Sequence, residues 1–330
     1  MIGISEFEKK QILFAFLSAG EKVSFSNDNI VIKTADGKIK HQSTCYRLFL
    51  LFVIGHITIT SGILQRASRF GFGVVLMSNG LKVYDFIGSK MEGNVLLRRH
   101  QYDYKGLDLA KHILENKVHN QRILLEEERH KNAELKQVIE KLKAYEKRIS
   151  AYDGKDLSEL LGLEGLAARL FFSSFYREEE WHGRKPRIKP DYINSTLDIG
   201  YTLLFNYIEA LLNVYGFDTY CGVLHREFYM RKSLVCDLVE PFRTLIDRQV
   251  RKSVHLKQCK PEDFQNINGR YLLKWEKNTE YVRFLVQSLL ERKMEIFKYI
   301  QGYYRAFMKQ KAAKDYPVFW GGVTDGNNKL

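Results

Sequence analysis

The chain has 330 residues, of which 52 are lysine or arginine and 39 are aspartate or glutamate, giving a formal net charge of +13. This length is more than one hydrophobic core usually organises, so we expect two domains. Four scattered cysteines without a Cys-x-x-Cys pair argue against a zinc ribbon and against a secreted disulfide framework, which favours a cytoplasmic protein. The longest apolar run, Leu48 to Ile54, is too short to cross a bilayer, and we expect no membrane span.

The positive charge favours a polyanionic partner such as nucleic acid, because lysine and arginine that neutralise phosphates release condensed counterions. A soluble protein that is merely basic is the alternative. Composition therefore favours nucleic acid as the partner, and only the sequence motifs can indicate which reaction the protein catalyses.

The N-terminal part reads as a small β-rich domain. Apolar residues among the first twenty fall at near-helical spacing, at positions 7, 12, 13, 16 and 17. Short strands then follow, at 23–25, 30–33, 55–60 and 74–77, with a helix at 62–70 inserted among them. Asn79-Gly80 predicts a hairpin turn into the run 81–84.

After Gly93 the apolar period changes to three or four residues, which predicts amphipathic helices as far as about residue 312. The clearest case runs from Leu135 to Ile149. The charged stretch 126–136 is most simply a solvated helical face. We therefore expect an α+β protein, with a β-rich domain at 1–90, a linker at 91–105, an all-α catalytic domain at 106–315 and a flexible tail at 316–330.

A glutamate interrupts the apolar side of the helix that begins near Leu157. The stripe runs through positions 157, 160, 161, 164, 167, 168 and 171, and position 164 is Glu164. A buried carboxylate costs several kcal/mol unless it is paired or binds a metal. An ion pair with an internal arginine, such as Arg169 or Arg243, explains Glu164 at least as well at this point.

A second predicted helix, at 233–250, carries two acidic residues three positions apart. Asp237 lies among apolar residues, and Glu240 follows it. This spacing puts both carboxylates on one face, where like charges repel unless a cation lies between them. A divalent metal removes the conflict. His225 ends the apolar segment before this helix, although a lone histidine there is more often a core residue than a ligand.

Three segments resemble, in order, the large subunit of the CRISPR spacer-acquisition integrase. They are Leu-Gly-Leu-Glu-Gly-Leu-Ala-Ala-Arg-Leu-Phe-Phe at 161–172, Asp-Tyr-Ile-Asn-Ser-Thr-Leu-Asp-Ile-Gly-Tyr at 191–201, and 222–243, where Gly-x-Leu-His precedes Ser-Leu-x-x-Asp-Leu-x-Glu-Pro-Phe-Arg. On the N-terminal side, 55–60, 74–80 and 94–101 resemble its β-domain and linker. The resemblance covers roughly residues 22 to 312.

The resemblance implies that Glu164, His225 and Glu240 coordinate the metal, with Asp237 as an accessory acid beside them. Arg243 takes the place of a basic residue near the DNA. Many members have aspartate as the third ligand, so Glu240 departs from them in side-chain length while the three-residue spacing is kept. One imidazole and two carboxylates suit Mg²⁺ or Mn²⁺, and the imidazole makes Zn²⁺ tolerable.

The implied activity is that of a metal-dependent DNA integrase, which joins protospacer 3′-hydroxyl ends to the CRISPR repeat by transesterification. The sequence agrees, since it contains no Gly-x-Ser-x-Gly elbow, Walker loop or dinucleotide fingerprint. Two alternatives stay open. One is a hydrolytic nuclease with the same ligands, and the other is a non-catalytic basic DNA-binding protein, which has no need of buried acids.

Four arginines in the N-terminal half are candidates for holding phosphates of a double-stranded DNA: Arg66, Arg69, Arg98 and Arg99. Each is equally well explained as solvated surface charge. The resemblance also implies a homodimer that joins a small ferredoxin-like partner dimer. No residue pattern in this chain indicates that interface.

Overall fold

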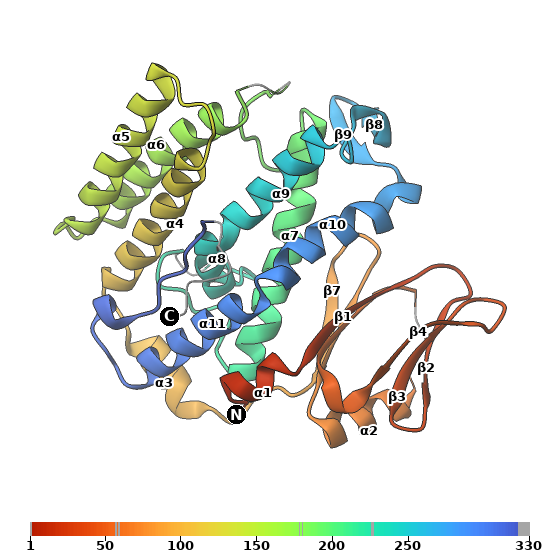
Figure 1. Cartoon of the computed structure of the whole chain (residues 1–330). Helices are drawn as coiled ribbons and strands as arrows, with labels where there is room; N and C mark the ends of the chain where they lie inside the picture. Colours follow the sequence, from red (N-terminus) through yellow and green to blue (C-terminus); the bar gives the residue numbers. More distant parts are fainter. Residues whose placement is uncertain are drawn as a thin grey trace. The chain divides into compact units, whose positions relative to one another are not determined.

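The computed structural model describes residues 2–56, 58, 60–177, 179, 181–225 and 228–322 (Figure 1). The chain divides into two compact units. The β-rich unit contains Met1–Arg99 and Asn206–Asp218, and the helical unit contains His100–Phe205 and Thr219–Leu330. The first boundary falls within the segment 91–105, where the sequence suggested a linker.

The β-rich unit contains two sheets. In the four-stranded sheet, of order β1-β5-β6-β7, β1 and β6 are parallel to β5, and β7 is antiparallel to β6. The other sheet is antiparallel, with the order β2-β3-β4. The bounds are α1 Ile4–Glu8, β1 Gln11–Leu17, β2 Lys22–Ser26, β3 Asn29–Lys33, β4 Ile39–Thr44, η1 Cys45–Arg47, β5 Leu48–Gly55, α2 Ser61–Phe70, β6 Gly73–Met77 and β7 Val83–Gly88.

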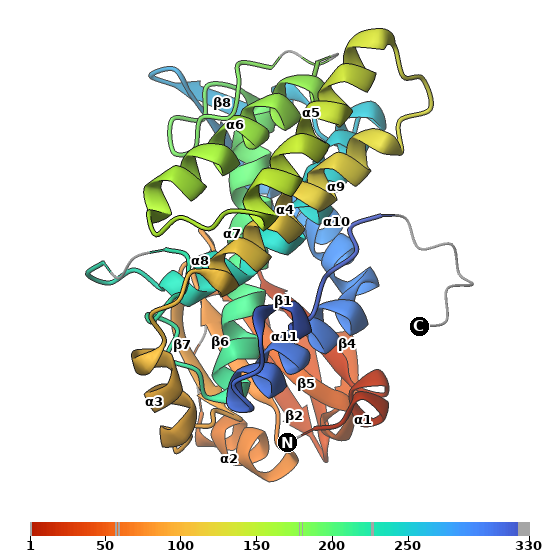
Figure 2. The same cartoon turned by 90° about the vertical axis from the view of Figure 1, so that its left-hand side faces the viewer.

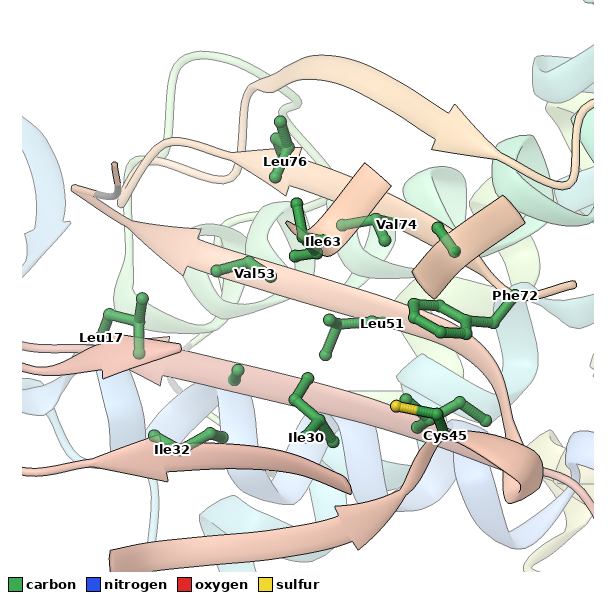
Figure 3. Packing of buried hydrophobic residues seen from close by; sticks show 13 residues of the cluster. Leu17, Ile30, Ile32, Cys45, Leu51, Val53, Ile63, Phe72, Val74 and Leu76 are labelled. Carbon is green, nitrogen blue, oxygen red and sulfur yellow. The ribbon is translucent and has the colours of Figure 1, made fainter. Parts of the chain in front are cut away.

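The central strand β5 is buried along its whole length, as expected for a continuous apolar run covered on both faces of a sheet. On one face, Leu51 and Val53 join a core that includes Ile30 from β3 and Ile63 from α2 (Figure 3). On the other face, Phe52 meets the ring of Tyr207 edge-on at a centroid distance of 6.4 Å. The sheet is therefore held between two apolar layers.

The predicted helix at 62–70 and the hairpin at 79–80 are confirmed as α2 and the β6–β7 turn. The strand predicted at 55–60 was wrong. Gly55 ends β5, and residues 56, 58 and 60 lie outside any strand, while 57 and 59 lie outside the described residues. The helical spacing near the N-terminus was also misleading, because residues 11–17 form β1.

The region after residue 93 is mainly helical, as predicted. Its bounds are α3 Val95–Asp103, α4 Asp108–Glu126, α5 Ala133–Ser150, α6 Leu157–Phe175, α7 Tyr192–Tyr215, α8 Ser233–Val239, η2 Glu240–Phe242, α9 Arg243–His255, α10 Asn278–Glu291 and α11 Lys293–Met308. Helices α3 and α7 each contribute residues to both units. Among the described residues, no helix is both long and apolar enough to span a membrane.

Helices α4, α5 and α6 pack against one another (Figure 1). The starts of α5 and α6 are capped by side chains, since Asn132 accepts from the Leu135 amide and Asp156 from the Ser158 amide, both at 2.8 Å. The charged stretch 126–136 was expected to be one helical face, but residues 127–132 form the connection between α4 and α5.

Two further features of the helical unit were not predicted. Strands β8 Phe264–Ile267 and β9 Arg270–Leu273 form a hairpin whose turn is Asn268-Gly269, and both turn residues have positive φ. Residues 316–322, here called the C-terminal strap, pack against the helices instead of forming the start of a loose tail. Within the strap Phe319 is buried, and its backbone carbonyl and amide exchange two hydrogen bonds with the side chain of Asn116 of α4.

Candidate active site

Two glutamates from different helices share one lysine. Glu164 lies on α6, Glu240 begins η2, and Lys117 lies on α4. The Lys117 Nζ is 2.6 Å from Oε1 of Glu164 and 2.6 Å from Oε2 of Glu240. The carboxylates therefore converge on a single positive charge in a mostly buried position.

A second cation holds Glu240, because Arg243 Nε donates to the same Oε2 atom at 2.8 Å. Burial works to raise the pKa of Glu240, but Arg243 and Lys117 outweigh it and lower the pKa to about 2. Burial likewise works to lower the pKa of Lys117, but the charges of Glu240 and Glu164 hold it above its usual value. Glu240 and Lys117 are thus both charged at neutral pH.

Pro241 explains why Glu240 begins a tight turn. Proline lacks an amide hydrogen and its ring clashes with the carbonyl four residues earlier, so the predicted helix at 233–250 breaks into α8, η2 and α9. The carbonyl of Pro241 accepts a 2.9 Å hydrogen bond from the side chain of Asn120 of α4. The Asn120 Oδ1 atom accepts in turn from the Gly321 amide of the C-terminal strap at 2.8 Å. The turn that carries Glu240 is thereby fastened to α4.

Asp237 is fully buried and organises the loop that carries His225. Its oxygens accept from the backbone amides of Val223, Leu224 and His225 at 2.6, 3.0 and 2.9 Å. It also lies 2.7 Å from Nδ1 of His225. Because an ionised carboxylate only accepts, Nδ1 carries the proton and Nε2 faces away from Asp237. This arrangement fixes the tautomer of a metal-binding histidine in many proteins.

A polar network continues behind Arg243. The Arg243 guanidinium lies 4.7 Å from the centre of the Tyr201 ring, and the Tyr201 hydroxyl donates to Asp247. Burial raises the pKa of Asp247 to about 7, although the hydrogen bond from Tyr201 and the charge of Arg243 act in the opposite direction. Its other oxygen, Oδ2, has no hydrogen-bond partner among the described residues.

The structure brings Glu164 and Glu240 together around Lys117, and it brings His225 and Asp237 together. It does not assemble a full ligand cluster: in the described part of the chain, no group of three or more His, Cys, Asp or Glu side chains could hold a metal ion. The Glu164 and Glu240 carboxylates nevertheless suit a bound cation, because both already contact the ammonium group of Lys117.

The five arginines proposed to contact DNA lie in different settings. Arg243 belongs to the site itself. Arg66 is tied within the β-rich unit, where its guanidinium lies 4.6 Å from the Phe25 ring, and Arg98 Nε donates to the Gly216 carbonyl at 3.3 Å. Arg69 is exposed and pairs with a partly exposed Asp28 at 3.7 Å, and Arg99 is exposed. Arg69 and Arg99 are therefore the more available of the four N-terminal arginines.

Lys117 was missed in the sequence, although a signal was present. It lies on α4 in line with the buried residues Ala110, Ile113 and Leu114, at the spacing of one helical face. The argument that singled out Glu164, a charge on an apolar stripe, applies equally to this lysine. Considered together, Glu164 and Lys117 predict an ion pair between two helices.

A family model described as "CRISPR associated protein Cas1" matches residues 15–286. The chain belongs to the Cas1 family. A "CRISPR-associated endonuclease Cas1 1" from Thermodesulfovibrio yellowstonii is 28% identical over 274 residues, covering 78% of this chain and 86% of that protein. A relative of the same description from Archaeoglobus fulgidus is 28% identical over 303 residues, which cover 83% of this chain and 86% of that protein.

Solved structures share the fold. A Cas1 protein from Thermotoga maritima matches with a TM-score of 0.70 at 18% identity, covering 89% of this chain and 96% of that one. A "casposase bound to integration product" matches with a TM-score of 0.71 at 20% identity, covering 96% of each chain. A "Cas6-RT-Cas1--Cas2 complex" matches with a TM-score of 0.74 at 24% identity, and the match covers 94% of this chain and 36% of that chain. The predicted α+β class, with β-sheets followed by a helix-rich region, is confirmed.

Proposed function

We propose that this Cas1-family protein is a metal-dependent DNA integrase that joins DNA 3′-hydroxyl ends to a CRISPR repeat by transesterification. The observation that carries the proposal is the convergence of Glu164 and Glu240 on one cation. A buried and a partly buried acid that share one cation favour a catalytic centre, whereas a protein that only coats DNA has no need of them. The match to a casposase bound to its integration product supports the same class of reaction.

The chain's own residues have distinct tasks in this proposal. Glu164, His225 and Glu240 are the metal ligands, and Asp237 contacts Nδ1 of His225, which leaves Nε2 as the atom that would bind the metal. Arg243 holds Glu240 and carries a positive charge that suits a phosphate oxygen. The metal, which we propose to be Mg²⁺ or Mn²⁺, would polarise the attacked phosphoryl oxygen. Lys117 balances the two carboxylates when the metal is absent.

The proposed DNA is double-stranded, comprising the incoming duplex and the repeat. Arg66, Arg69, Arg98 and Arg99 remain proposed phosphate contacts, with Arg69 and Arg99 favoured by their exposure. We also propose a homodimer with a small ferredoxin-like partner. The match to a complex that contains a Cas2 component supports such a partner.

Hydrolysis is a second candidate, because the relatives are named endonucleases. A metal held by the same ligands would stabilise the transition state whether the entering oxygen came from DNA or from water. Positioning of the DNA 3′ end must therefore select the reaction. The donor end provides the test.

A labelled duplex ending in 3′-hydroxyl is incubated with a repeat-bearing plasmid, the partner protein and Mn²⁺. We expect a joined strand, and no joined strand from the same duplex ending in 3′-dideoxy. Substitutions E164A, H225A and E240A should each abolish joining while salt-dependent DNA binding is retained. The matched control is E159A, which removes an exposed glutamate from the same helix, α6.

Identical nicking with both donors and no joined strand would identify a hydrolytic nuclease. Equal loss of DNA binding and joining in folded variants would contradict the separation of binding from chemistry. If E159A loses joining as completely as E164A, the assignment of Glu164 fails.

A further inference from the structure

A tip of three consecutive large side chains, Phe228, Tyr229 and Met230, stands on the loop before α8. Their exposed fractions are 74%, 87% and 71%, and no other large hydrophobic residue of the described chain is as exposed. Figure 2 shows this loop extending outwards beside α8. An exposed apolar cluster of this kind marks a site of interaction on a folded protein.

The backbone holds the tip outward. The Arg231 amide donates to the Phe228 carbonyl at 2.9 Å, which closes a turn. Met230 has a φ of 58°, in the left-handed region that non-glycine residues rarely adopt. The turn therefore keeps three apolar side chains in contact with water, and the backbone of Met230 adopts an unfavourable conformation to do so.

The composition of the loop suits a DNA duplex. Two cations, Arg231 and Lys232, follow the tip directly, in a chain of net charge +13. Proteins that deform DNA insert apolar side chains, including phenylalanine and methionine, between base steps while nearby cations contact the phosphates. Aromatic faces such as that of Tyr229 also stack on unpaired bases of any sequence.

The tip is close to the proposed chemistry. Phe228 is three residues from His225, so their Cα atoms are at most about 11 Å apart. That separation is roughly three base steps of 3.4 Å along one DNA strand. A side chain on the tip can therefore reach the base pairs beside a phosphate held near His225.

We propose that Phe228, Tyr229 and Met230 form a wedge that unstacks the target duplex next to the attacked phosphodiester. The proposal rests on the proposed integrase function. Unstacking releases the phosphate from its regular duplex geometry, so that the donor 3′-hydroxyl can approach in line. The wedge carries out no chemistry and acts by positioning the DNA.

The test compares a triple variant, F228S/Y229S/M230S, with the wild type on two targets. One target is fully paired, and the other carries mismatches at the attacked step, which unstack it in advance. We expect the variant to join donor to the paired target roughly 10- to 100-fold more slowly than the wild type. On the mismatched target the two proteins should differ by less than about threefold. The control Y84S removes an exposed tyrosine from β7 and should leave both rates unchanged.

A direct readout uses 2-aminopurine at the attacked step of the paired target. Its fluorescence should rise when the wild type binds and stay low with the triple variant, at DNA concentrations that saturate both. This measurement needs no strand transfer, so it separates the wedge from the integrase reaction. A fluorescence rise without joining by the wild type would contradict the proposed function and leave the wedge supported.

Three results would overturn the wedge. The variant could join the paired target as fast as the wild type. It could lose activity equally on both targets, which would indicate a structural role for the loop. It could keep all its DNA properties and lose only its association with the partner protein, which would make the tip a protein-docking surface.

Discussion

Lys117 Nζ lies 2.6 Å from Oε1 of Glu164, although the two residues are 47 positions apart in the chain. The lysine occupies the point on which Glu164 and Glu240 converge. It is therefore the natural counter-charge of an acidic site whenever no metal neutralises it.

Replacing Lys117 by methionine should destabilise the protein while divalent metal is absent. Removing one partner of a buried ion pair leaves uncompensated charge, and we expect a loss of about 3 kcal/mol in the free energy of unfolding. Urea denaturation in the presence of a chelator measures this loss, and added Mn²⁺ should recover most of it. The control is K111M, since Lys111 lies on the same helix but pairs with an exposed Asp108. Equal stability of K117M and the wild type in chelator would contradict the prediction.

Asp247 should make stability fall as the pH rises. Burial raises its pKa from 3.8 to about 7 in the folded protein, so the folded state binds this proton more tightly than the unfolded state. The stabilisation is complete below about pH 4 and is lost as the pH rises to about 7. The free energy of unfolding should fall over this pH range by on the order of 4 kcal/mol. The D247N variant, which stays neutral, should lack this dependence and exceed the wild type in stability at pH 8. A wild-type stability that follows D247N between pH 4 and pH 8 would show that Asp247 is ionised throughout.

Gly222 and Gly165 should respond oppositely to alanine. A Cβ on Gly222 would lie 2.7 Å from Oδ2 of Asp237 and 2.9 Å from the backbone carbon of Ser233, so Asp237 must shift and the His225 loop with it. We expect G222A to lose at least about tenfold in strand transfer and roughly 1 to 3 kcal/mol in stability. A Cβ on Gly165 of α6 meets nothing within 4 Å, and G165A should gain up to about 1 kcal/mol. Joining assays and thermal unfolding of both variants provide the measurement, and an active G222A would contradict the role given to Asp237.

The Asn116 side chain should be a strong stabiliser of the helical unit. It exchanges two buried hydrogen bonds with Phe319, at 2.8 and 2.9 Å. The N116A variant leaves a buried carbonyl and a buried amide without partners, which should lower the free energy of unfolding by roughly 2 to 4 kcal/mol. Asn266 caps an exposed turn by accepting from the Gly269 amide, so N266A should cost less than about 1 kcal/mol. Similar losses in the two variants would show that the strap contributes little to stability.

Periodic segments were predictable because one physical cause dominates them. The α6 helix followed from its apolar stripe, and the β6–β7 hairpin followed from Asn79-Gly80. The β1 strand was not predictable, because pairing with β5 overrides the local spacing of its apolar residues. The β8–β9 hairpin carried the same Asn-Gly signal but was overlooked among the surrounding helices.

The site divides in the same way. The buried acids could be found in the sequence because a carboxylate on an apolar stripe is anomalous by itself. That Glu164 and Glu240 share Lys117 could not be predicted from the sequence, because it depends on how α4, α6 and η2 pack. The four contacts that hold Asp237 to the His225 loop depend likewise on the tertiary structure.

The bonds from Asn116 and Asn120 to the C-terminal strap join segments 203 and 201 positions apart. At the usual speed of synthesis, of about 5 to 20 residues per second, α4 emerges from the ribosome roughly 10 to 40 seconds before its partners in the strap. Asn120 also supports the turn that carries Glu240. The support that the strap gives, through Asn120, to the turn that carries Glu240 therefore becomes available only after residue 321 has been synthesised, well after Glu240 itself.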